Sequence, residues 1–523
     1  MYELKKLTNM SLEEKVGQLF LVAVNGPGVS EKYKQHFLKH KLGNFICFAY
    51  DLKDYAFIRN LTDELQAITK ESCGIPAFIS VDQEGGMVTR VFSGATHFSS
   101  NMAVTASQMN SSVETMGHMV GKELRALGLN LNHAPSLDVN NNAENPIIGI
   151  RSYSDDPNVV ARMGVDYIKG LQKGGVMANA KHFPGHGDTS MDSHHELPTI
   201  PHGLDRLNEL ELIPFKEAIK NGVDSIMTAH IIFKLIDPKY PATLSEKIIT
   251  GFLREELGFE GIVVSDCMTM NAIKEGYTTA QGCVIALNAG IDLLCLNATE
   301  ELQTECYNKV LNAVKSGELP LAKVDKAVAR ILKHKEKYNL TTPAPAPLEI
   351  YPEHEKLADE ISKKAITLVY DNKNLLPIKD KKIMAISPMP VRTAITDDAD
   401  SSLQSFAKQA STEFNCPFKE TGINPDTEEI QEILEAAKDF NIILLASYHA
   451  LTNPGQTSLF NALKSADKQV ILVTLHLPYD MLKMPNADAS VAAYEYTGRA
   501  VKNALYALAG KQAFLGKMPV SNC

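Results

Sequence analysis

The sequence contains no tryptophan, no excess of basic residues and no apolar run long enough to cross a membrane. A membrane-spanning helix needs roughly 20 consecutive apolar residues. Lys and Arg together number 52 against 62 Asp and Glu, which gives a formal net charge of −10. These absences argue against a membrane span, a nucleic-acid scaffold and a polybasic membrane binder. A hydrophobic content of 44% with 22% charged residues is typical of a globular protein.

The sequence also lacks the cysteine spacing of redox and zinc motifs, because none of its eight cysteines forms a C-x-x-C pair. Cys47, Cys283 and Cys295 lie inside apolar runs, so we expect buried free thiols rather than a disulfide framework. The short apolar stretch Leu19–Val24 follows acidic residues and precedes no small-residue cleavage site, which favours a strand over a signal peptide. A reducing compartment preserves unpaired thiols, so the sequence predicts a cytoplasmic protein.

The length of 523 residues is too great for one ordinary domain and suits a barrel with a smaller partner. The clearest boundary is Thr341–Pro347, TTPAPAP, where alternating prolines stiffen the chain and prevent a helix from continuing. We therefore predict a first domain over residues 1–340, a Pro-rich linker over 341–348 and a second domain over 349–523.

Eight apolar runs precede this linker, and each is followed by polar or Gly-rich residues and then a helix-like segment. Continuous apolar runs of this kind are typical of buried parallel strands with helical crossovers, and eight such units close into a (β/α)8 TIM-like barrel. The runs are Gln18–Val24, Asn44–Phe48, Ala77–Val81, Asn130–Val139, Val176–Phe183, Ser225–Ile231, Gly261–Asp266 and Asp292–Leu296.

Four further apolar runs follow the linker and alternate with helix-like segments such as Thr427–Asp439, which favours a smaller α/β sandwich. We expect the final Gly516–Ser521, GKMPVS, to add a short edge strand. The four runs are Ala365–Tyr370, Ile383–Ser387, Asn441–Ser447 and Gln469–Leu475.

Ionisable residues gather where the barrel runs end. A charged side chain at the end of a buried strand loses solvation, so it usually has a partner or a function. Barrel closure brings these ends together, which predicts a common site at the carboxyl ends of the strands. The residues are Asp82, Lys181, His182, His230 and Asp266.

The densest polar segment is Lys181–His194, KHFPGHGDTSMDSH, whose proline and glycines predict a tight loop. Asp192 stands two residues before His194, so its carboxylate can accept the imidazole N–H, orient the ring and raise its pKa. A histidine oriented in this way can act first as an acid and then as a base. We expect His186 and His195 to be bystanders.

These residues resemble the signature of glycoside hydrolase family 3, in its β-N-acetylglucosaminidase branch. The most specific segment is Lys181-His182-Phe183-Pro184-Gly185-x-Gly187 followed by Asp192-Ser193-His194. GKMPVS resembles the C-terminal end of the family, and five other segments appear in family order through the first domain. They are VDQEGG at Val81–Gly86, NPIIGIRSY at Asn145–Tyr153, MTAH at Met227–His230, PATLS at Pro241–Ser245 and SDCMTM at Ser265–Met270.

The resemblance implies a role for each matching position. Asp266 matches the catalytic nucleophile, although a helix cap is the alternative for this residue. His194 matches the general acid/base of this branch, held by Asp192. Met87 departs from the family pattern and receives no role. The positions that match sugar-binding residues are Asp82, Arg90, Arg151, Lys181 and His182.

The resemblance implies a retaining exo-β-N-acetylglucosaminidase that needs no cofactor and no metal. Its substrate would be a small carbohydrate with terminal GlcNAc, either a peptidoglycan fragment or a chitooligosaccharide. The lack of tryptophan removes the usual stacking platform for long polysaccharides and favours short substrates. The sequence makes no prediction of oligomeric state or of the role of the second domain.

Several alternatives stay open. A neutral histidine would repel phosphate less than a carboxylate does, which allows a GlcNAc phosphorylase. A β-glucosidase would take its general acid from the second domain, and Glu495 is the candidate there. A catalytically silent sugar-binding protein is a further alternative. A metal-dependent barrel hydrolase is also possible by composition. Its potential ligands are His182, His186, His194, His230, Asp188 and Asp266.

Overall fold

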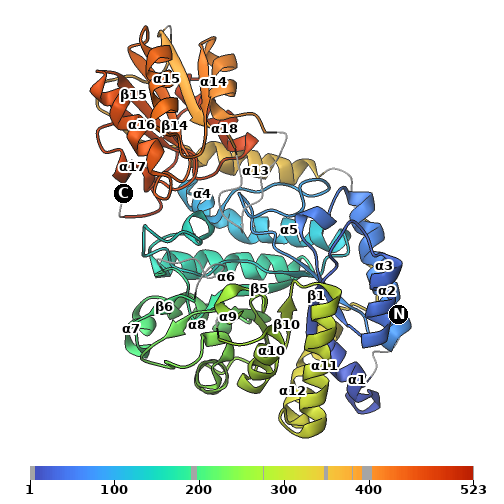
Figure 1. The fold of residues 1–523 in the computed structure, drawn as a ribbon. Helices are drawn as coiled ribbons and strands as arrows, with labels where there is room; N and C mark the ends of the chain where they lie inside the picture. Colours follow the sequence, from blue (N-terminus) through green and yellow to red (C-terminus); the bar gives the residue numbers. More distant parts are fainter. Residues whose placement is uncertain are drawn as a thin grey trace.

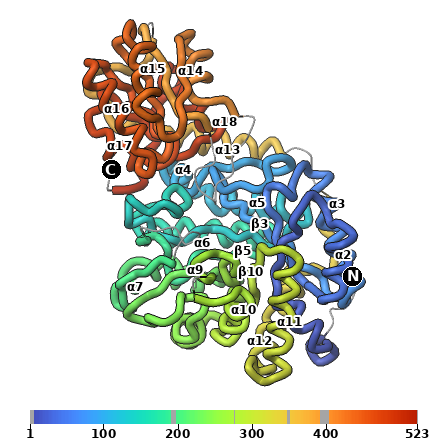
Figure 2. Tube along the Cα trace, in the orientation of Figure 1, coloured from blue at the N-terminus to red at the C-terminus, as the bar shows by residue number. Residues whose placement is uncertain are grey.

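The computed structural model describes residues 6–189, 197–274, 276–346, 351–379, 381–390 and 403–521. Within them a parallel barrel, blue to yellow in Figure 1, is followed by a smaller α/β unit in orange and red. The trace in Figure 2 shows the smaller unit seated on the side of the barrel that carries α4 and α5. This architecture confirms the predicted fold class.

The barrel contains eight parallel strands, and their hydrogen-bonded order is β10-β1-β2-β3-β4-β5-β7-β9. A parallel bridge between Val264 and Leu293 brings β9 back to β10 and closes the ring. All eight predicted runs contain a strand, although several strands are shorter than the runs. The strands are β1 Phe20–Ala23, β2 Asn44–Ile46, β3 Phe78–Val81, β4 Leu131–Asn132, β5 Met177–Phe183, β7 Ser225–Thr228, β9 Ile262–Ser265 and β10 Leu294–Leu296.

Helices cover the outside of the barrel and bury their apolar faces against the strands. Local signals fix their ends: Ser11 caps α1 in a capping box, and Asp156 caps α6 just before Pro157. The α-helices are α1 Leu12–Gln18, α2 Glu31–His40, α3 Tyr55–Cys73, α4 Asn101–Ala106, α5 Val113–Ala126, α6 Pro157–Lys173, α7 Leu204–Glu209, α8 Leu212–Lys220, α9 Asn271–Lys274, α10 Thr279–Ala289, α11 Glu300–Ser316 and α12 Leu321–Lys337, and a π-helix spans Lys247–Glu256.

The smaller unit contains a six-stranded sheet in the order β11-β16-β15-β14-β12-β13. Only the pair between β11 and β16 is antiparallel among the described strands. The elements are α13 Pro352–Ala365, β11 Thr367–Asp371, β12 Ile383–Pro388, α14 Phe406–Phe414, β13 Phe418–Thr421, α15 Thr427–Ala437, β14 Ile442–Ser447, α16 Pro454–Ser465, β15 Gln469–Thr474, α17 Asp480–Lys483, β16 Ala489–Ala492 and α18 Gly498–Leu508.

The sequence prediction of the smaller unit was incomplete and in one place wrong. The strands β13 and β16 were not predicted. The prediction of the barrel likewise omitted the short paired strands β6 Thr199–Ile200 and β8 Ile232–Phe233. The predicted edge strand at Gly516–Ser521 is absent from the described residues. The backbone N–H of Gly516 donates to Ile366, whereas that of Lys517 donates to Ala106, so this segment joins no single ladder.

The two units share an apolar interface and several hydrogen bonds. Met87, Met102 and Ile150 of the barrel belong to the same buried cluster as the core of the six-stranded sheet. Met87, which departed from the family pattern, therefore packs between the units. The Asn140 amide donates to the Tyr479 hydroxyl at 2.9 Å, which ties the loop after β4 to the second unit.

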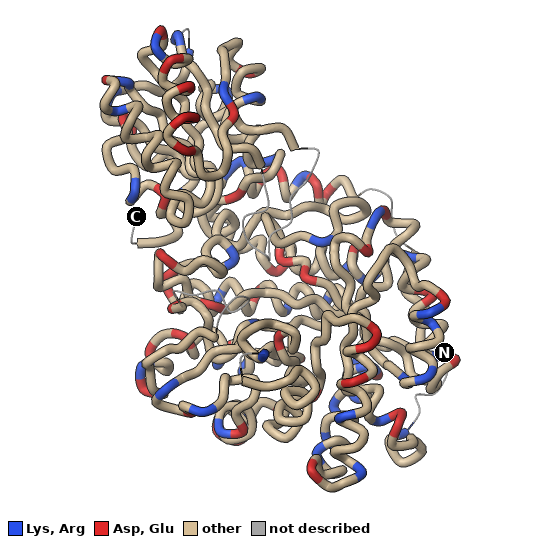
Figure 3. Tube along the Cα trace, in the orientation of Figure 1, with Lys and Arg blue, Asp and Glu red and all other residues tan. Residues whose placement is uncertain are grey.

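Charge and hydropathy agree with the composition. Figure 3 shows basic and acidic residues interspersed along both units. No helix within the described ranges is both long and apolar enough to cross a membrane. The seven described cysteines are all free, and six of them are buried, as the sequence predicted; the exception is Cys267.

Candidate active site

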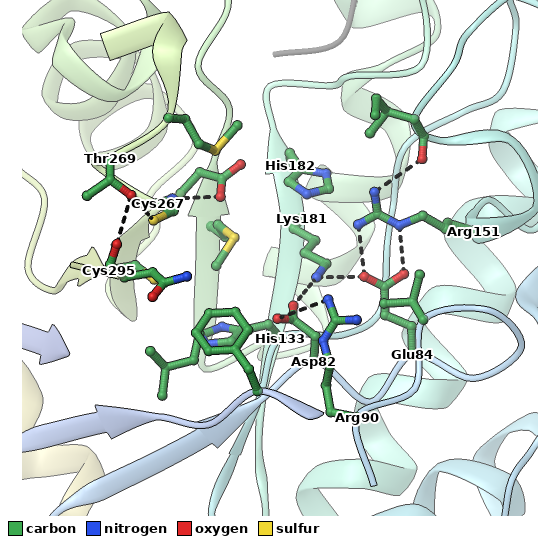
Figure 4. A pocket seen from close by; sticks show the side chains of 18 of the residues that line it. Asp82, Glu84, Arg90, His133, Arg151, Lys181, His182, Cys267, Thr269 and Cys295 are labelled. Atoms are coloured by element: carbon green, nitrogen blue, oxygen red, sulfur yellow. Dashed lines mark hydrogen bonds and ion pairs between the residues drawn. The ribbon is translucent and has the colours of Figure 1, made fainter. Parts of the chain in front are cut away.

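A cavity of about 570 Å³ opens at the carboxyl ends of the barrel strands. Figure 4 shows Asp82, Glu84, Arg151 and Lys181 on one side of it, with Cys267 and Thr269 on the opposite side. Six of the residues predicted to form a site line this one cavity, so barrel closure does bring the strand ends together. They are Asp82, Arg90, Arg151, Lys181, His182 and Asp266.

The first side of the cavity is a chain of buried ion pairs. Lys181 Nζ lies 2.7 Å from an oxygen of Asp82 and 2.7 Å from Oε1 of Glu84. Arg151 donates to both oxygens of Glu84, from Nε at 2.9 Å and from Nη2 at 2.8 Å. Arg90 approaches Asp82 to 4.0 Å. Buried charges of this kind are costly alone, and here each is neutralised by a partner.

These partners keep the carboxyl groups ionised. Burial opposes ionisation of Asp82, but Lys181 and Arg90 outweigh it and hold the pKa of Asp82 well below its usual range. Burial likewise opposes ionisation of Glu84, but Arg151 and Lys181 lower its pKa to about 2. Asp82 and Glu84 in turn raise the pKa of Lys181, against the effect of burial. Fixed acceptors and fixed donors therefore stand side by side at any ordinary pH.

The turn that carries Asp82 and Glu84 requires its paired glycines. Gly85 and Gly86 adopt φ of 101° and 56°, a region that side chains disfavour. A Cβ on Gly85 would lie 2.7 Å from the Ser99 carbonyl oxygen, and one on Gly86 would lie 2.6 Å from Cβ of Ser100. The DQEGG segment therefore places its acids through a backbone that only glycine fits.

His182 and His186 are held by Asp138, a residue that the sequence analysis missed. His182 donates from Nδ1 to Oδ2 of Asp138 at 2.7 Å, and the backbone N–H of His186 donates to Oδ1 at 2.7 Å. Burial opposes ionisation of Asp138, but His182 outweighs it and holds the pKa of Asp138 well below its usual range. Asp138 comes near the end of the fourth apolar run, so the strand-end signal that selected Asp82 could have selected it too.

His186, expected to be a bystander, also lines the cavity. Its Nδ1 lies 2.9 Å from the Thr189 hydroxyl. Burial and the neighbouring His182 lower the pKa of His186 to about 4, so its ring is neutral near pH 7. Asn145 donates to the backbone carbonyls of His186 and Gly187, which fixes the start of this loop beside the cavity.

His133 lines the cavity and was also missed by the sequence analysis. Its Nδ1 accepts from the Asn179 amide at 2.7 Å, so its Nε2 carries the proton and donates to the Ser80 hydroxyl at 3.0 Å. Burial lowers the pKa of His133 to about 4. The apolar run around it gave no sign that the side chain faces the cavity.

Asp266 follows β9 and lines the cavity, and the next residue, Cys267, lies across the cavity from Lys181 in Figure 4. The backbone N–H of Cys267 donates to its Oδ1 at 2.7 Å. The next helix, α9, begins only at Asn271, so Asp266 is not its cap. A carboxylate that projects into a cavity across from fixed donors has the position of a nucleophile or a base.

His230, another predicted strand-end residue, does not line the cavity. Its Nε2 donates to the carbonyl of Cys267 at 3.0 Å, and its Nδ1 lies 2.8 Å from the Thr243 hydroxyl. Its side chain is buried because it braces the turn after Asp266. Its position at the end of a strand correctly predicted that His230 is buried, but His230 does not belong to the cavity.

Asp192 and His194, the predicted acid/base pair, lie outside the described residues. The described chain stops at Thr189, beside the cavity-lining His186, and resumes at Leu197. Asp188 pairs with Nε2 of His202 at 2.6 Å, which joins the two flanks of the segment.

The metal-site hypothesis finds no ligand set in the described ranges, where no group of three or more His, Cys, Asp or Glu residues is arranged to hold an ion. Its potential ligands His182 and His230 are engaged by Asp138 and by the Cys267 carbonyl. Glu495, the acid of the β-glucosidase alternative, is buried between the two units. It accepts from the backbone N–H of Ser100 at 2.7 Å and does not line the cavity.

Comparison with known proteins adds three similarities. The profile of the glycosyl hydrolase family 3 N-terminal domain matches residues 11–334, more than half of the chain. Beta-hexosaminidase A of Pseudoalteromonas piscicida is 31% identical over 509 residues, which cover 88% of this chain and 84% of the relative. The solved structure of a family 3 beta-N-acetylglucosaminidase from Paenibacillus sp. str. FPU-7 is 38% identical with a TM-score of 0.93, and the match covers 98% of this chain and 99% of that one.

Proposed function

The chain belongs to glycosyl hydrolase family 3, and from that premise we propose that it is a retaining exo-β-N-acetylglucosaminidase. It is a glycoside hydrolase that removes terminal non-reducing GlcNAc. One observation carries the proposal for the site. Asp266 lines the same cavity as the ionic chain of Asp82, Glu84, Lys181 and Arg151, and its volume of about 570 Å³ is usual for small-molecule sites.

The ionic chain suits recognition of the terminal sugar. Sugar hydroxyls need both acceptors and donors, and a site with fixed partners rejects a sugar that leaves them unpaired. We assign the hydroxyl and N-acetyl contacts to the five predicted binding residues. These are Asp82, Arg90, Arg151, Lys181 and His182.

The proposed reaction has two steps. In the first, Asp266 attacks the anomeric carbon and forms a bond to it, while the bond to the leaving oxygen breaks and His194 protonates that oxygen. In the second, the neutral His194 takes a proton from water, and this water displaces Asp266 from the anomeric carbon. Two displacements at one carbon retain its configuration. Asp192 orients His194 through the imidazole N–H.

The leaving part of the substrate would face an aromatic pair at the mouth of the cavity. Phe48 and Tyr50 both line it, and their rings stack at a centroid distance of 5.6 Å and an angle of 13°. Tyr50 is 53% exposed, so it offers a ring face to a second sugar. This small platform supports short substrates, such as a peptidoglycan fragment or a chitooligosaccharide, in a chain that has no tryptophan.

The six buried free thiols support a reducing, cytoplasmic setting. In that setting peptidoglycan fragments released for recycling would be the natural substrates.

The experiment that tests this function is a panel of aryl glycosides of GlcNAc, glucose and xylose. We expect hydrolysis of the GlcNAc substrate with initial retention of configuration, followed by NMR. His194→Ala should lower kcat by about 10²–10⁴-fold, whereas the neighbouring His195→Ala serves as the matched control and should leave kcat within about twofold. Preference for glucose, or equal effects of the two variants, would contradict the proposal.

The same assay separates hydrolysis from phosphorolysis. Adding inorganic phosphate should leave free GlcNAc as the product. Formation of GlcNAc 1-phosphate would instead establish the phosphorylase alternative.

A further inference from the structure

Two thiols stand in the wall that carries Asp266, and the proposed hydrolysis uses neither. Cys267 follows Asp266 directly, Cys295 belongs to β10, and both line the cavity. Figure 4 shows them across the cavity from Asp82 and Lys181. The Met268 backbone N–H donates to the Cys295 carbonyl at 2.9 Å, so the turn after β9 that carries Cys267 lies beside β10.

Access from the cavity selects one of the two thiols. Cys267 is half-buried, whereas the other six described cysteines are buried. The Cys295 residue is only 3% exposed. Of the two residues, Cys267 is therefore the more accessible to a reagent that enters the cavity.

The surroundings of Cys267 favour its reactive form. Its Sγ lies 3.1 Å from the Thr269 hydroxyl, and the backbone amides of Thr269 and Asn297 also face it. Hydrogen bonding from the Cys295 side chain is the largest influence, and together these donors lower the pKa of Cys267 to about 6 despite burial. The same pairing raises the pKa of Cys295 well above its usual value. The Cys267 thiolate is therefore stabilised by the neighbouring thiol of Cys295, which stays protonated.

We propose that Cys267 is a covalent modification site for low-molecular-weight disulfides, and that the attached group occupies the cavity beside Asp266. The Cys267 thiolate attacks one sulfur of R–S–S–R, a new S–S bond forms, and the old one breaks. The released R–S⁻ takes up the proton that Cys267 lost, so the products are the mixed disulfide and R–SH. The reagent disulfide is itself the oxidant, and excess thiol reverses the step.

The effect of the adduct on turnover follows because Cys267 is the residue next to Asp266, and it rests on the proposed function. The adduct would be bonded one residue from Asp266, in the space that the anomeric carbon needs. It would therefore block turnover without unfolding the chain. A buried thiol such as Cys416, in the second unit, has no comparable access.

The first arm of the test counts labelled thiols and needs no activity. The full chain carries Cys523→Ser, because that terminal thiol lies outside the described residues, and is treated with 5,5′-dithiobis(2-nitrobenzoate). We expect one fast equivalent of released thionitrobenzoate and one adduct by intact mass. Cys267→Ser and Cys267→Ala should abolish the fast equivalent, and Cys416→Ser should retain it. A fast equivalent that persists in both Cys267 variants would overturn the proposal.

The second arm separates activation and blocking. Cys295→Ala should slow the fast reaction about threefold to tenfold, because the thiolate loses its main donor. An unchanged rate would show that Cys295 does not activate the Cys267 thiolate. Loss of aryl-GlcNAc turnover should track the label and reverse with dithiothreitol, whereas each Cys267 variant should keep its own turnover rate in the reagent. Labelled protein that still turns over would overturn the blocking step, and an enzyme inactive before labelling would count against the proposed function alone.

Discussion

Parallel strands end at a common edge in both units, and polar side chains gather at both edges, yet the two edges differ in charge and in space. At the barrel edge, cationic partners lower the pKa of Glu84 to about 2, and the cavity holds about 570 Å³. At the edge of the smaller sheet, burial raises the pKa of Asp480 and Glu495, and the spaces nearby hold about 10 Å³ each. Such a space admits one water at most. Strand ends alone therefore do not make a site; paired charge beside an open cavity does.

The barrel edge should respond most strongly to loss of Asp266. Asp266→Asn keeps the shape of the side chain and removes the nucleophilic charge. We expect kcat on aryl-GlcNAc to fall by at least about 10³-fold with the denaturation midpoint nearly unchanged. A folded variant with near-normal kcat would contradict the claim that the barrel edge, unlike the edge of the smaller sheet, carries the catalytic site.

Glu84→Gln tests the ionic chain. The variant leaves Arg151 without its charged partner and Lys181 with Asp82 alone. We expect kcat/KM to fall about 10²-fold because the sugar contacts shift. Breaking a buried ion pair should also cost about 3 kcal/mol of unfolding free energy at pH 7.

The pH dependence of Glu84 has a defined sign. Its pKa in the folded protein is lowered from 4.5 to about 2, so its contribution is present above pH 4.5 and is lost as the pH falls toward 2. The stability difference between wild type and Glu84→Gln should shrink over that window in denaturant titrations. A difference independent of pH would contradict the assignment.

The aromatic pair at the mouth should have a moderate effect. Tyr50→Ala removes a stacking face worth about 0.5–1.5 kcal/mol, so kcat/KM for a GlcNAc disaccharide should fall about twofold to tenfold. GlcNAc fluoride, which has no leaving sugar, is the matched substrate and should be little affected. Equal losses on both substrates would contradict a contact between Tyr50 and the leaving sugar.

Glu495→Gln should have the smallest effect on turnover, within about twofold, although Glu495 also follows a parallel strand end. Its raised pKa gives the opposite sign from Glu84. The stability of the wild type relative to the variant should be greatest below the usual carboxyl pKa and decline as the pH rises through the raised value. A large fall in kcat would favour the β-glucosidase type of acid instead.

The sequence was most informative where burial and charge coincide. All eight barrel strands lay within apolar runs, because strands buried on both faces are apolar without interruption. The strand-end signal selected Asp82, Lys181 and Asp266, which line the cavity. It also selected His230, which does not line it and whose partners are Thr243 and the Cys267 carbonyl.

Other features depend on contacts that no local pattern encodes. His133 lines the cavity, and Asp138 holds two histidines that do, because β4 ends beside β5 and β3 in the closed barrel. β13 is a partly exposed edge strand with the polar sequence FKET, so it gave no apolar run. β16 is a short run of small residues whose pairing with β11 and β15 defines it.

Trapping the covalent intermediate tests the central claim most directly. A slowly hydrolysed fluorinated GlcNAc donor should add one glycosyl unit to the full chain, and peptide mapping should place it on Asp266. The label should disappear on prolonged incubation as the enzyme recovers turnover. A label on another carboxylate, or an inverted first product with no adduct, would contradict the account.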